Sequence, residues 1–212
     1  MYKRDMPYMK NKIILITGPK HSGKSLATRA LGQFTGYITL DLDELIEKFN
    51  GKSPRELYKE GPEIFRKAEA RALAFMIGQG MRAEQLNSGT EYIIAATGGG
   101  LADNSEALAL LSSHKEIIIV YLEVSSDTAW QRIMENSRNP PPGPRTEGSL
   151  GEVPPRNGEL PAFLNTENPR GTQLALHEHR AKVYKKMAHL VITAEKKSPE
   201  EIAMEIIKRL EL

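Results

Sequence analysis

The sequence contains no cysteine, and this absence excludes two kinds of protein. A chain without thiols has neither a disulfide framework nor thiolate ligands for a metal centre, and it fits a reducing compartment. Long hydrophobic runs are missing too, because the apolar run behind the basic N-terminal segment covers only residues 13–16. A membrane span needs about 20 apolar residues, and a signal peptide needs a longer apolar region with a cleavage site. We therefore expect a cytoplasmic protein that binds no membrane.

A strong charge imbalance is also missing. The 29 Lys and Arg residues stand against 27 Asp and Glu residues, which leaves a net charge of +2. A nucleic-acid-handling NTPase would show a basic stripe with interleaved aromatic residues, and none is visible, so we expect no nucleic-acid partner. What is present is an ordinary globular composition, with 40% hydrophobic and 26% charged residues over 212 positions. That length suffices for one well-buried domain.

Short apolar runs alternate with helical patterns along most of the chain. Strands are expected at 12–17, 37–40, 92–96, 117–124 and 190–193, and helices at 24–33, 44–49, 63–77, 104–111, 127–134, 173–187 and 199–210. This alternation predicts an α/β fold, in which helices cover both faces of a parallel sheet. Right-handed crossovers then place the ligand-binding loops at the carboxyl ends of the strands.

The alternation is interrupted between residues 139 and 170. This interval holds eight of the 13 prolines and shows no apolar periodicity. A stretch of that length without regular structure is typical of a functional lid or a disordered segment. We expect a single domain over 12–212 that carries this lid and is preceded by an N-terminal tail at 1–11. A start at Met9 would leave the first eight residues as a disordered tail.

The segment Gly18–Ser25 matches the phosphate-loop pattern G-x-x-x-x-G-K-[ST] in full, between a predicted strand and a predicted helix. Gly18 and Gly23 let the backbone curl so that successive N–H groups point at phosphate oxygens. Lys24 is expected to reach the β- and γ-phosphates, and Ser25 to bind Mg²⁺. The alternative, a glycine-rich turn that fits by chance, is disfavoured by this context. The predicted ATP-binding residues of the loop are Gly18, Lys20, Ser22, Gly23, Lys24 and Ser25.

Two carboxylates, Asp41 and Asp43, follow the second predicted strand. Residues two apart on an extended segment face the same side, so both can reach one site. A kinase uses one carboxylate to hold the magnesium shell and another to orient or deprotonate the acceptor hydroxyl. Alternatively, Asp43 caps a helix that begins at Glu44, and Asp41 is a solvated strand end. The position of the pair, at the expected edge of the site, favours the functional interpretation.

Two further patterns offer groups for a small anionic acceptor. Arg66 and Glu69 share a predicted helical face, where the guanidinium can grip a carboxylate through two hydrogen bonds and Glu69 can orient it from behind. A surface ion pair is the alternative. Gly98, Gly99 and Gly100 follow a strand, and three glycines suggest that something approaches the backbone closely. A flexible turn is the alternative there.

Taken in order, these motifs resemble the shikimate kinase family. The segments that carry the resemblance are GPKHSGKS at 18–25, DLD at 41–43, FRKAE at 65–69, GGG at 98–100, HRAKVY at 179–184 and SPEE at 198–201. The resemblance implies a monomer with a three-layer P-loop kinase fold, similar to the nucleoside monophosphate kinases, around a central parallel five-stranded sheet. It also implies transfer of the γ-phosphoryl group of ATP, with Mg²⁺, to the 3-hydroxyl of shikimate in aromatic amino-acid (chorismate) biosynthesis.

The resemblance assigns roles to individual residues. Asp43 would bind the shikimate hydroxyls and act as the general base or assist it, while Asp41 would support Mg²⁺ through water. Arg66 would hold the shikimate carboxylate, helped by Arg180. Substrate contacts are further implied for Gly98, Gly99 and Gly100, and adenine-side contacts for Lys197 and Pro199.

One position departs from the family pattern. Where the family's lid carries an arginine directly before a proline, this chain has Leu160. Loss of such a phosphate clamp costs several orders of magnitude in rate if nothing replaces it. Arg138, at the start of the lid, fits a second lid arginine and is a predicted catalytic residue. The candidates to replace the missing arginine are Arg138, Arg145, Arg156 and Arg170.

Two alternatives to shikimate kinase stay open at this point. The first is a kinase of the same fold that acts on another small acid or polyol, such as gluconate. The second is a nucleotide-binding regulatory module with weak transfer activity, which the leucine at position 160 favours.

Overall fold

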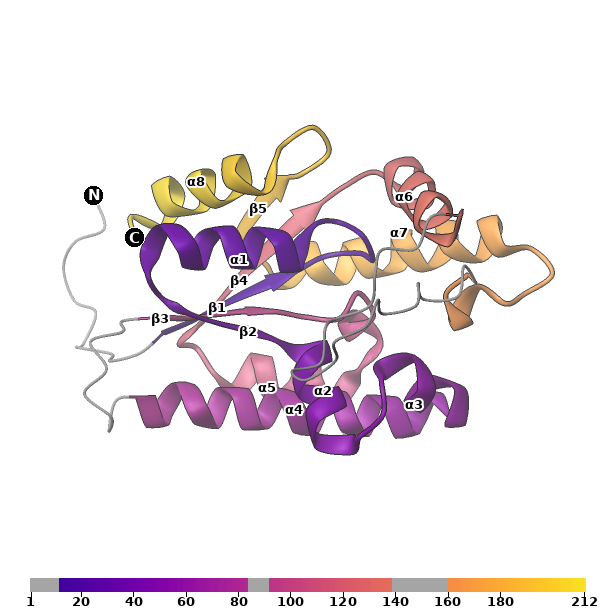
Figure 1. Cartoon of the computed structure of the whole chain (residues 1–212), viewed down its shortest axis with the longest axis horizontal. Coiled ribbons are helices and arrows are strands. Elements are labelled where there is room, and N and C mark those ends of the chain that lie inside the picture. Colours follow the sequence, from indigo (N-terminus) through magenta and orange to yellow (C-terminus); the bar gives the residue numbers. More distant parts are fainter. Residues whose placement is uncertain (1–11, 84–91, 139–159) are drawn as a thin grey trace, which may run out of the picture.

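The computed structural model describes residues 12–83, 92–138 and 160–212, which are built around one parallel sheet (Figure 1). Its strands are β1 (Lys12–Thr17), β2 (Ile38–Asp41), β3 (Tyr92–Ala96), β4 (Ile117–Glu123) and β5 (Leu190–Thr193). The five strands lie in the order β2-β3-β1-β4-β5, and all neighbouring pairs are parallel. The prediction of a parallel five-stranded sheet is confirmed, with each strand within one residue of its expected bounds.

Helices connect these strands in the order that the alternation of patterns predicts. They are α1 (Lys24–Thr35), α2 (Leu42–Asn50), α3 (Pro54–Glu60), α4 (Pro62–Ala83), α5 (Ser105–Ser113), α6 (Ser126–Arg138), α7 (Pro169–Met187) and α8 (Pro199–Leu210), with short 3-10 turns η2 (Leu101–Asp103) and η3 (Ala162–Leu164). In Figure 1, α1 and α8 lie on one side of the sheet and α4 and α5 on the other.

The central strand β1 shows why helices are needed on both sides. Residues 13–16 are each at most 2% exposed, which is the continuous apolar run of a strand buried on both faces. Ile13 and Leu15 pack in a cluster with buried side chains of α2, α4 and α5. Ile14 and Ile16 pack in a second cluster with those of α1 and α8. The expected three-layer P-loop kinase architecture is therefore confirmed.

Side-chain caps set the helix starts that apolar periodicity placed imprecisely. The Asp41 carboxylate accepts a hydrogen bond from the Asp43 N–H, so α2 begins at Leu42 rather than at the expected Glu44. The alternative that Asp43 is the cap is therefore wrong. Asn168 caps α7, which consequently starts at its N1 proline and not at residue 173.

Helix α3 is absent from the sequence-based prediction. It begins behind a capping box, in which the Ser53 hydroxyl accepts from the Glu56 N–H and the Glu56 carboxylate accepts from the Ser53 N–H. Ser-x-x-Glu with proline at N1 is a helix-start signal that could have revealed it. The helix is short, and only Leu57 of its residues is fully buried, so it has almost no apolar periodicity to detect.

The predicted lid lies largely outside the described residues, as do its Arg145 and Arg156 and the predicted tail at 1–11. The described end of the lid, residues 160–170, is packed on the body of the domain. Leu164 in η3 is fully buried, and Arg55 Nη2 in α3 donates to the Leu160 carbonyl at 3.1 Å. The segment that replaces the expected arginine is thus anchored through its backbone.

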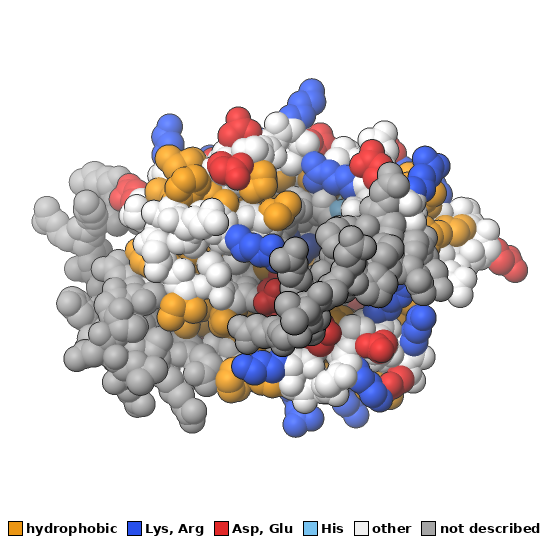
Figure 2. All heavy atoms as spheres, in the orientation of Figure 1, with side chains coloured by type: hydrophobic (Ala, Val, Ile, Leu, Met, Phe, Trp, Pro, Cys, Tyr) orange, Lys and Arg blue, Asp and Glu red, His pale blue; other side chains and the backbone are white. Residues whose placement is uncertain are grey.

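The described surface mixes charges of both signs. On the face shown in Figure 2, Lys and Arg side chains alternate with Asp and Glu, and no basic stripe gathers among the described side chains. Within the described ranges, no helix is both long and apolar enough to cross a bilayer.

Candidate active site

The phosphate loop connects β1 to α1 and takes the shape that its glycines allow. Gly18 has φ 150° and Gly23 has φ 96°, a region that disfavours other residues. A Cβ on Gly18 would also lie 2.7 Å from the Leu122 carbonyl oxygen and 2.8 Å from Ser22 Oγ. The backbone curl predicted for this loop is therefore present, and the two glycines are required for it.

Lys24, the first residue of α1, points back into the loop. Its side chain is buried, with Nζ donating to the Pro19 carbonyl oxygen at 2.8 Å. Burial lowers the pKa of Lys24 to about 8, while the nearby charges of Asp43 and Asp41 oppose that shift. Ser22 Oγ is buried in the same loop and has no hydrogen-bond partner among the described residues. A buried cation and an unpaired hydroxyl are the groups that a phosphate would satisfy.

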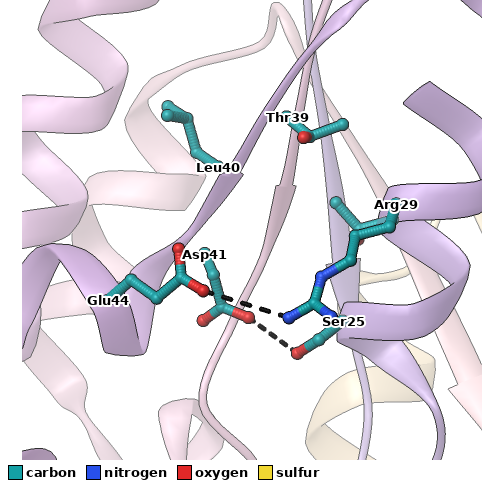
Figure 3. Close-up of a pocket in the computed structure, with 7 residues that line it drawn as sticks. Ser25, Arg29, Thr39, Leu40, Asp41 and Glu44 are labelled. Atoms are coloured by element: carbon teal, nitrogen blue, oxygen red, sulfur yellow. Dashed lines mark hydrogen bonds and ion pairs between the residues drawn. The ribbon is translucent and has the colours of Figure 1, made fainter. Parts of the chain in front are cut away.

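Ser25 and Asp41 meet beside the loop, as the metal prediction requires. Ser25 Oγ donates to Asp41 Oδ2 at 2.6 Å, and Figure 3 shows this bond. Beside it lies a small pocket of about 50 Å³, at whose edge Arg29 and Glu44 pair at 4.0 Å. The pocket is lined by Ser25, Thr28, Arg29, Thr39, Leu40, Asp41 and Glu44.

The Ser25 hydroxyl and the Asp41 carboxylate would suit Mg²⁺ better than a metal that needs a full protein cage. Within the described residues, no group of three or more His, Asp or Glu side chains could hold a metal ion. Mg²⁺ keeps most of its ligands as water and substrate phosphates, so a hydroxyl and a carboxylate suffice.

Asp43 and Glu69 approach the backbone of Gly98 from two different helices. A Cβ on Gly98 would lie 3.1 Å from Asp43 Oδ1 and 3.2 Å from Glu69 Oε1. The negative charge of Asp43 also acts on Lys24, whose pKa it raises. Asp43 therefore lies between the phosphate loop and the first glycine of the triple-glycine turn.

Glu69 is held differently from the sequence-based expectation. Its Oε2 accepts from Asn104 Nδ2 at 2.9 Å, and the same Asn104 nitrogen donates to the Arg66 carbonyl at 2.8 Å. The Arg66 guanidinium instead pairs with Glu63, one turn earlier on the exposed face of α4. The prediction that Glu69 orients Arg66 is therefore wrong, because Glu69 points into the core while Arg66 finds an equally spaced carboxylate at the surface.

Burial raises the pKa of Glu69 to about 7, and the charge of Asp43 adds to this shift. Its Oε1 is buried and has no hydrogen-bond partner among the described residues. Because the native pKa lies above the ordinary value of 4.5, the folded state binds more protons than the unfolded state between these two values. This carboxyl group therefore makes the free energy of unfolding fall as pH rises from about 4.5 to about 7.

We predict that Glu69→Gln flattens this pH dependence. The amide oxygen can still accept from Asn104 Nδ2, while the ionisation disappears. Urea unfolding at pH 5 and pH 8 should show that the wild type loses more stability than Glu69→Gln, by roughly 1–3 kcal/mol. Glu135→Gln, on an exposed position of α6, is the matched control and should behave like the wild type. Equal pH dependence in wild type and Glu69→Gln would contradict the assignment.

The triple-glycine turn is packed between the phosphate loop and α7. A Cβ on Gly99 would lie 2.7 Å from the Lys20 nitrogen, so glycine is required for the two loops to touch. Tyr184 OH donates to the Gly99 carbonyl at 3.2 Å, and Arg180 Nη1 donates to the same oxygen at 3.3 Å. The predicted close approach is therefore to other parts of the protein itself, and the structure brings Arg180 to this turn.

Arg132 belongs to the site although the sequence analysis did not single it out. Its Nη1 donates to the His21 carbonyl at 3.0 Å, and its Nη2 donates to the Glu195 carbonyl at 3.1 Å. Asn136, one turn later on α6, contacts the His21 ring at 3.2 Å. Arg132 thus ties the phosphate loop to the segment between β5 and α8. The spacing of Arg132 and Asn136 on one helical face was the only available signal.

Burial lowers the pKa of His21 to about 4, and the charges of Lys20, Lys24 and Arg132 act in the same direction. The imidazole is therefore neutral at physiological pH. Its backbone φ of 61° is unusual for a residue with a side chain, so the loop geometry is imposed on this position.

Four further predicted residues are described, namely Arg170, Arg138, Lys197 and Pro199. Arg170 donates to the Ser126 carbonyl and contacts Asp127, and its guanidinium lies 5.4 Å over the Trp130 ring, so three residues of α6 hold it. It also contacts Gln173 on its own helix. Arg138 is exposed at the end of α6. Lys197 pairs with Glu205, and Pro199 is the first residue of α8.

The chain is similar to known proteins over nearly its whole length. The family model described as shikimate kinase matches residues 20–147, more than half of the chain. The shikimate kinase of Marinomonas sp. (strain MWYL1) is 28% identical over 195 residues, which cover 92% of this chain and 89% of that protein. The structure of shikimate kinase from Acinetobacter baumannii in complex with shikimate has a TM-score of 0.70 at 22% identity, covering 95% and 93% of the two chains. Shikimate kinase from Aquifex aeolicus vf5 has a TM-score of 0.62 at 26% identity, covering 94% and 96%.

Proposed function

Because the chain belongs to the shikimate kinase family, we propose that it transfers the γ-phosphoryl group of ATP to the 3-hydroxyl of shikimate. One observation carries the proposal beyond family membership. The phosphate loop, the carboxylate of Asp43 and the triple-glycine turn, which Arg180 of α7 contacts, meet at the carboxyl edge of the sheet. A nucleotide phosphate and a small acid would be held side by side there.

On the nucleotide side, the loop N–H groups, Lys24 and Ser22 bind the phosphates in this proposal. Lys24 is the buried cation of the loop, and a phosphate would supply the negative charge that its environment lacks. Arg132, which joins the phosphate loop to the Glu195 carbonyl, keeps the loop and the proposed adenine-side segment in fixed relation. Lys197 lies in that segment, and Pro199 begins α8 directly after it.

Mg²⁺, when bound with ATP, would supply positive charge that offsets the charge of the phosphate oxygens. We infer that the Ser25 hydroxyl and, through water, the Asp41 carboxylate hold the ion. Their mutual hydrogen bond keeps both oxygens directed at one place beside the loop. Asp41 is fixed further because its other oxygen caps α2.

On the acceptor side, Asp43 orients the attacking hydroxyl and takes its proton. Its position between Lys24 and Gly98 places a carboxylate beside both the phosphate loop and the triple-glycine turn. Arg180 and Arg66 bind the acceptor carboxylate, and Gly99 and Gly100 line its place. Arg180 is the better fixed of the two, with a side chain 11% exposed against 36% for Arg66.

The expected lid arginine has no counterpart at Leu160, and the described candidates differ in their availability. Arg170 would have to leave three contacts on α6 and one with Gln173 of α7, whereas Arg138 is exposed where the lid begins. We infer that Arg138 is the described arginine best placed to help neutralise the transferred phosphoryl group.

We further propose that the protein is a cytoplasmic monomer with one domain over 12–212. The absence of cysteine and of a long apolar run supports a reducing cytoplasmic setting. Both core clusters are completed within the described chain, which supports a monomer.

The function is tested by ADP release from ATP and Mg²⁺ with shikimate, gluconate and related acids offered separately. We expect strong stimulation by shikimate alone, because two arginines and the glycine turn suit a small carboxylate-bearing ring. Stimulation by gluconate in place of shikimate would move the function to another acid kinase. ATP binding without stimulation by any acid would favour the regulatory module that Leu160 suggests.

A further inference from the structure

We propose that Asp103 is a positioning residue that holds Arg180 in the orientation needed to bind the acceptor carboxylate, an inference that rests on the proposed function. Asp103 ends η2, directly behind the triple-glycine turn, whereas Arg180 lies 77 residues later on α7. The fold therefore places the Asp103 carboxylate beside Arg180, the predicted acid-binding arginine. Asp103 follows the triple-glycine turn, which would line the site of the same acceptor. No sequence motif pointed to this residue.

The contact between them constrains the guanidinium along one edge. Arg180 Nε and Nη2 both donate to Asp103 Oδ2, at 3.0 Å and 2.6 Å. Because two N–H donors of the guanidinium share one oxygen, the guanidinium cannot rotate freely about the bond between Cδ and Nε. The face of the guanidinium is fixed as well, because Cζ lies 5.2 Å from the centre of the Phe163 ring.

The remaining donors of Arg180 are turned toward the glycine turn. Nη1 donates to the Gly99 carbonyl at 3.3 Å, and a Cβ on Gly100 would lie 3.7 Å from Nη2. A guanidinium has five N–H donors, and these contacts to Asp103 and Gly99 use three of them. One donor is left on Nη1 and one on Nη2, and these remain for an acceptor carboxylate.

The partial burial of Arg180 and Asp103 costs desolvation free energy. The side chains of Arg180 and Asp103 are 11% and 21% exposed, and Asp103 Oδ1 is buried without a hydrogen-bond partner among the described residues. His179 Nε2 lies 4.0 Å from Asp103 Oδ1, beyond hydrogen-bond distance. An ion pair with an orphaned oxygen is a poor stabiliser, so its presence beside the acceptor site favours a positioning role.

The opposite role, in which Asp103 occupies the place of the acceptor carboxylate, predicts a different geometry. A competing carboxylate would take the Nη1 and Nη2 donors that this proposal assigns to the acceptor. Asp103 instead takes the Nε and Nη2 edge and leaves the other edge toward the glycine turn. Its negative charge repels an acceptor carboxylate, so the gain from a fixed guanidinium must outweigh that repulsion if KM is to rise when Asp103 is removed.

Steady-state kinetics of Asp103→Ala and Asp103→Asn test this inference. Shikimate KM should rise about tenfold in Asp103→Ala and less in Asp103→Asn, whose amide oxygen can still accept from Arg180. We expect KM for ATP and kcat to change by less than about twofold. With methyl shikimate, an uncharged acceptor, the same substitution should leave KM unchanged. Glu106→Gln, an exposed carboxylate on α5, is the control and should match the wild type.

A double-mutant cycle separates positioning from general disturbance. In an Arg180→Ala background, Asp103→Ala should add no further rise in shikimate KM. Three results would overturn the inference even if the wild type phosphorylates shikimate. They are an unchanged or lower shikimate KM in Asp103→Ala, an equal rise in KM for methyl shikimate, and full additivity of the KM effects of Asp103→Ala and Arg180→Ala. Wild-type protein without shikimate-stimulated turnover would overturn the proposed function, and this inference with it.

Discussion

Replacing Lys24 with alanine is expected to abolish phosphoryl transfer and leave the fold intact. Lys24 is the buried cation of the phosphate loop, with Nζ held against the Pro19 carbonyl at 2.8 Å. Its charge would stabilise the phosphoryl group during transfer, so kcat should fall by about 10³-fold or more. Burial lowers the pKa of Lys24 to about 8, which means that the folded state gains little from this cation. The melting temperature should therefore be unchanged or higher.

Shikimate-dependent ADP release and thermal unfolding, measured on the same preparation, check both halves of this prediction. Lys20→Ala is the matched control, since Lys20 is an exposed lysine in the same loop. It should weaken ATP binding modestly and retain most of kcat. A Lys24→Ala enzyme within tenfold of wild-type kcat would contradict the role assigned to Lys24.

Asp43→Asn should give the second large loss, about 10²–10⁴-fold in kcat. The amide keeps the size of the side chain but cannot accept the proton of the attacking hydroxyl. Binding of ATP should change little, because the loop contacts and the bond between Ser25 and Asp41 remain. The pKa of Lys24 should fall further, since the charge of Asp43 is the largest influence that raises it.

Glu44→Gln controls for the loss of a negative charge in the first turn of α2. Glu44 is a neighbouring exposed carboxylate that lines the small pocket and pairs with Arg29 (Figure 3). It should keep kcat close to the wild-type value. Equal losses in Asp43→Asn and Glu44→Gln would mean that local charge, rather than proton acceptance, explains the effect.

The fold and the phosphate loop were predictable because their physics is local. A strand buried on both faces is a continuous apolar run, and residues 13–16 form such a run, so the strand at 12–17 could be predicted from the sequence. The phosphate loop needs glycine at the positions of high φ, and Gly18 and Gly23 stand there. Ser25 and Asp41 were each predicted to hold Mg²⁺, and the structure brings their oxygen atoms within 2.6 Å of each other.

The errors concern contacts between segments far apart in the chain. Spacing of three residues places Glu69 and Glu63 equally well beside Arg66, and only the packing of Asn104 against α4 decides that Glu69 turns inward. Arg132 and Asp103 were missed for the same reason. Their partners, the His21 carbonyl and the Arg180 side chain, are 111 and 77 residues away.

The lid prediction stays partly open to experiment. Leu160 stands where the family has an arginine, and Arg170 is engaged by α6. Arg145 and Arg156 lie outside the described residues.

The most direct test of the central claim is the identity of the phosphorylated product. ATP and Mg²⁺ are incubated with the protein and an equimolar mixture of shikimate, gluconate and methyl shikimate, and the products are analysed by mass spectrometry and ³¹P–¹H NMR. The account predicts that shikimate is consumed first and carries the phosphate on its 3-hydroxyl. Phosphate on another hydroxyl, preferential phosphorylation of another compound, or ADP release with no phosphorylated acceptor would contradict it.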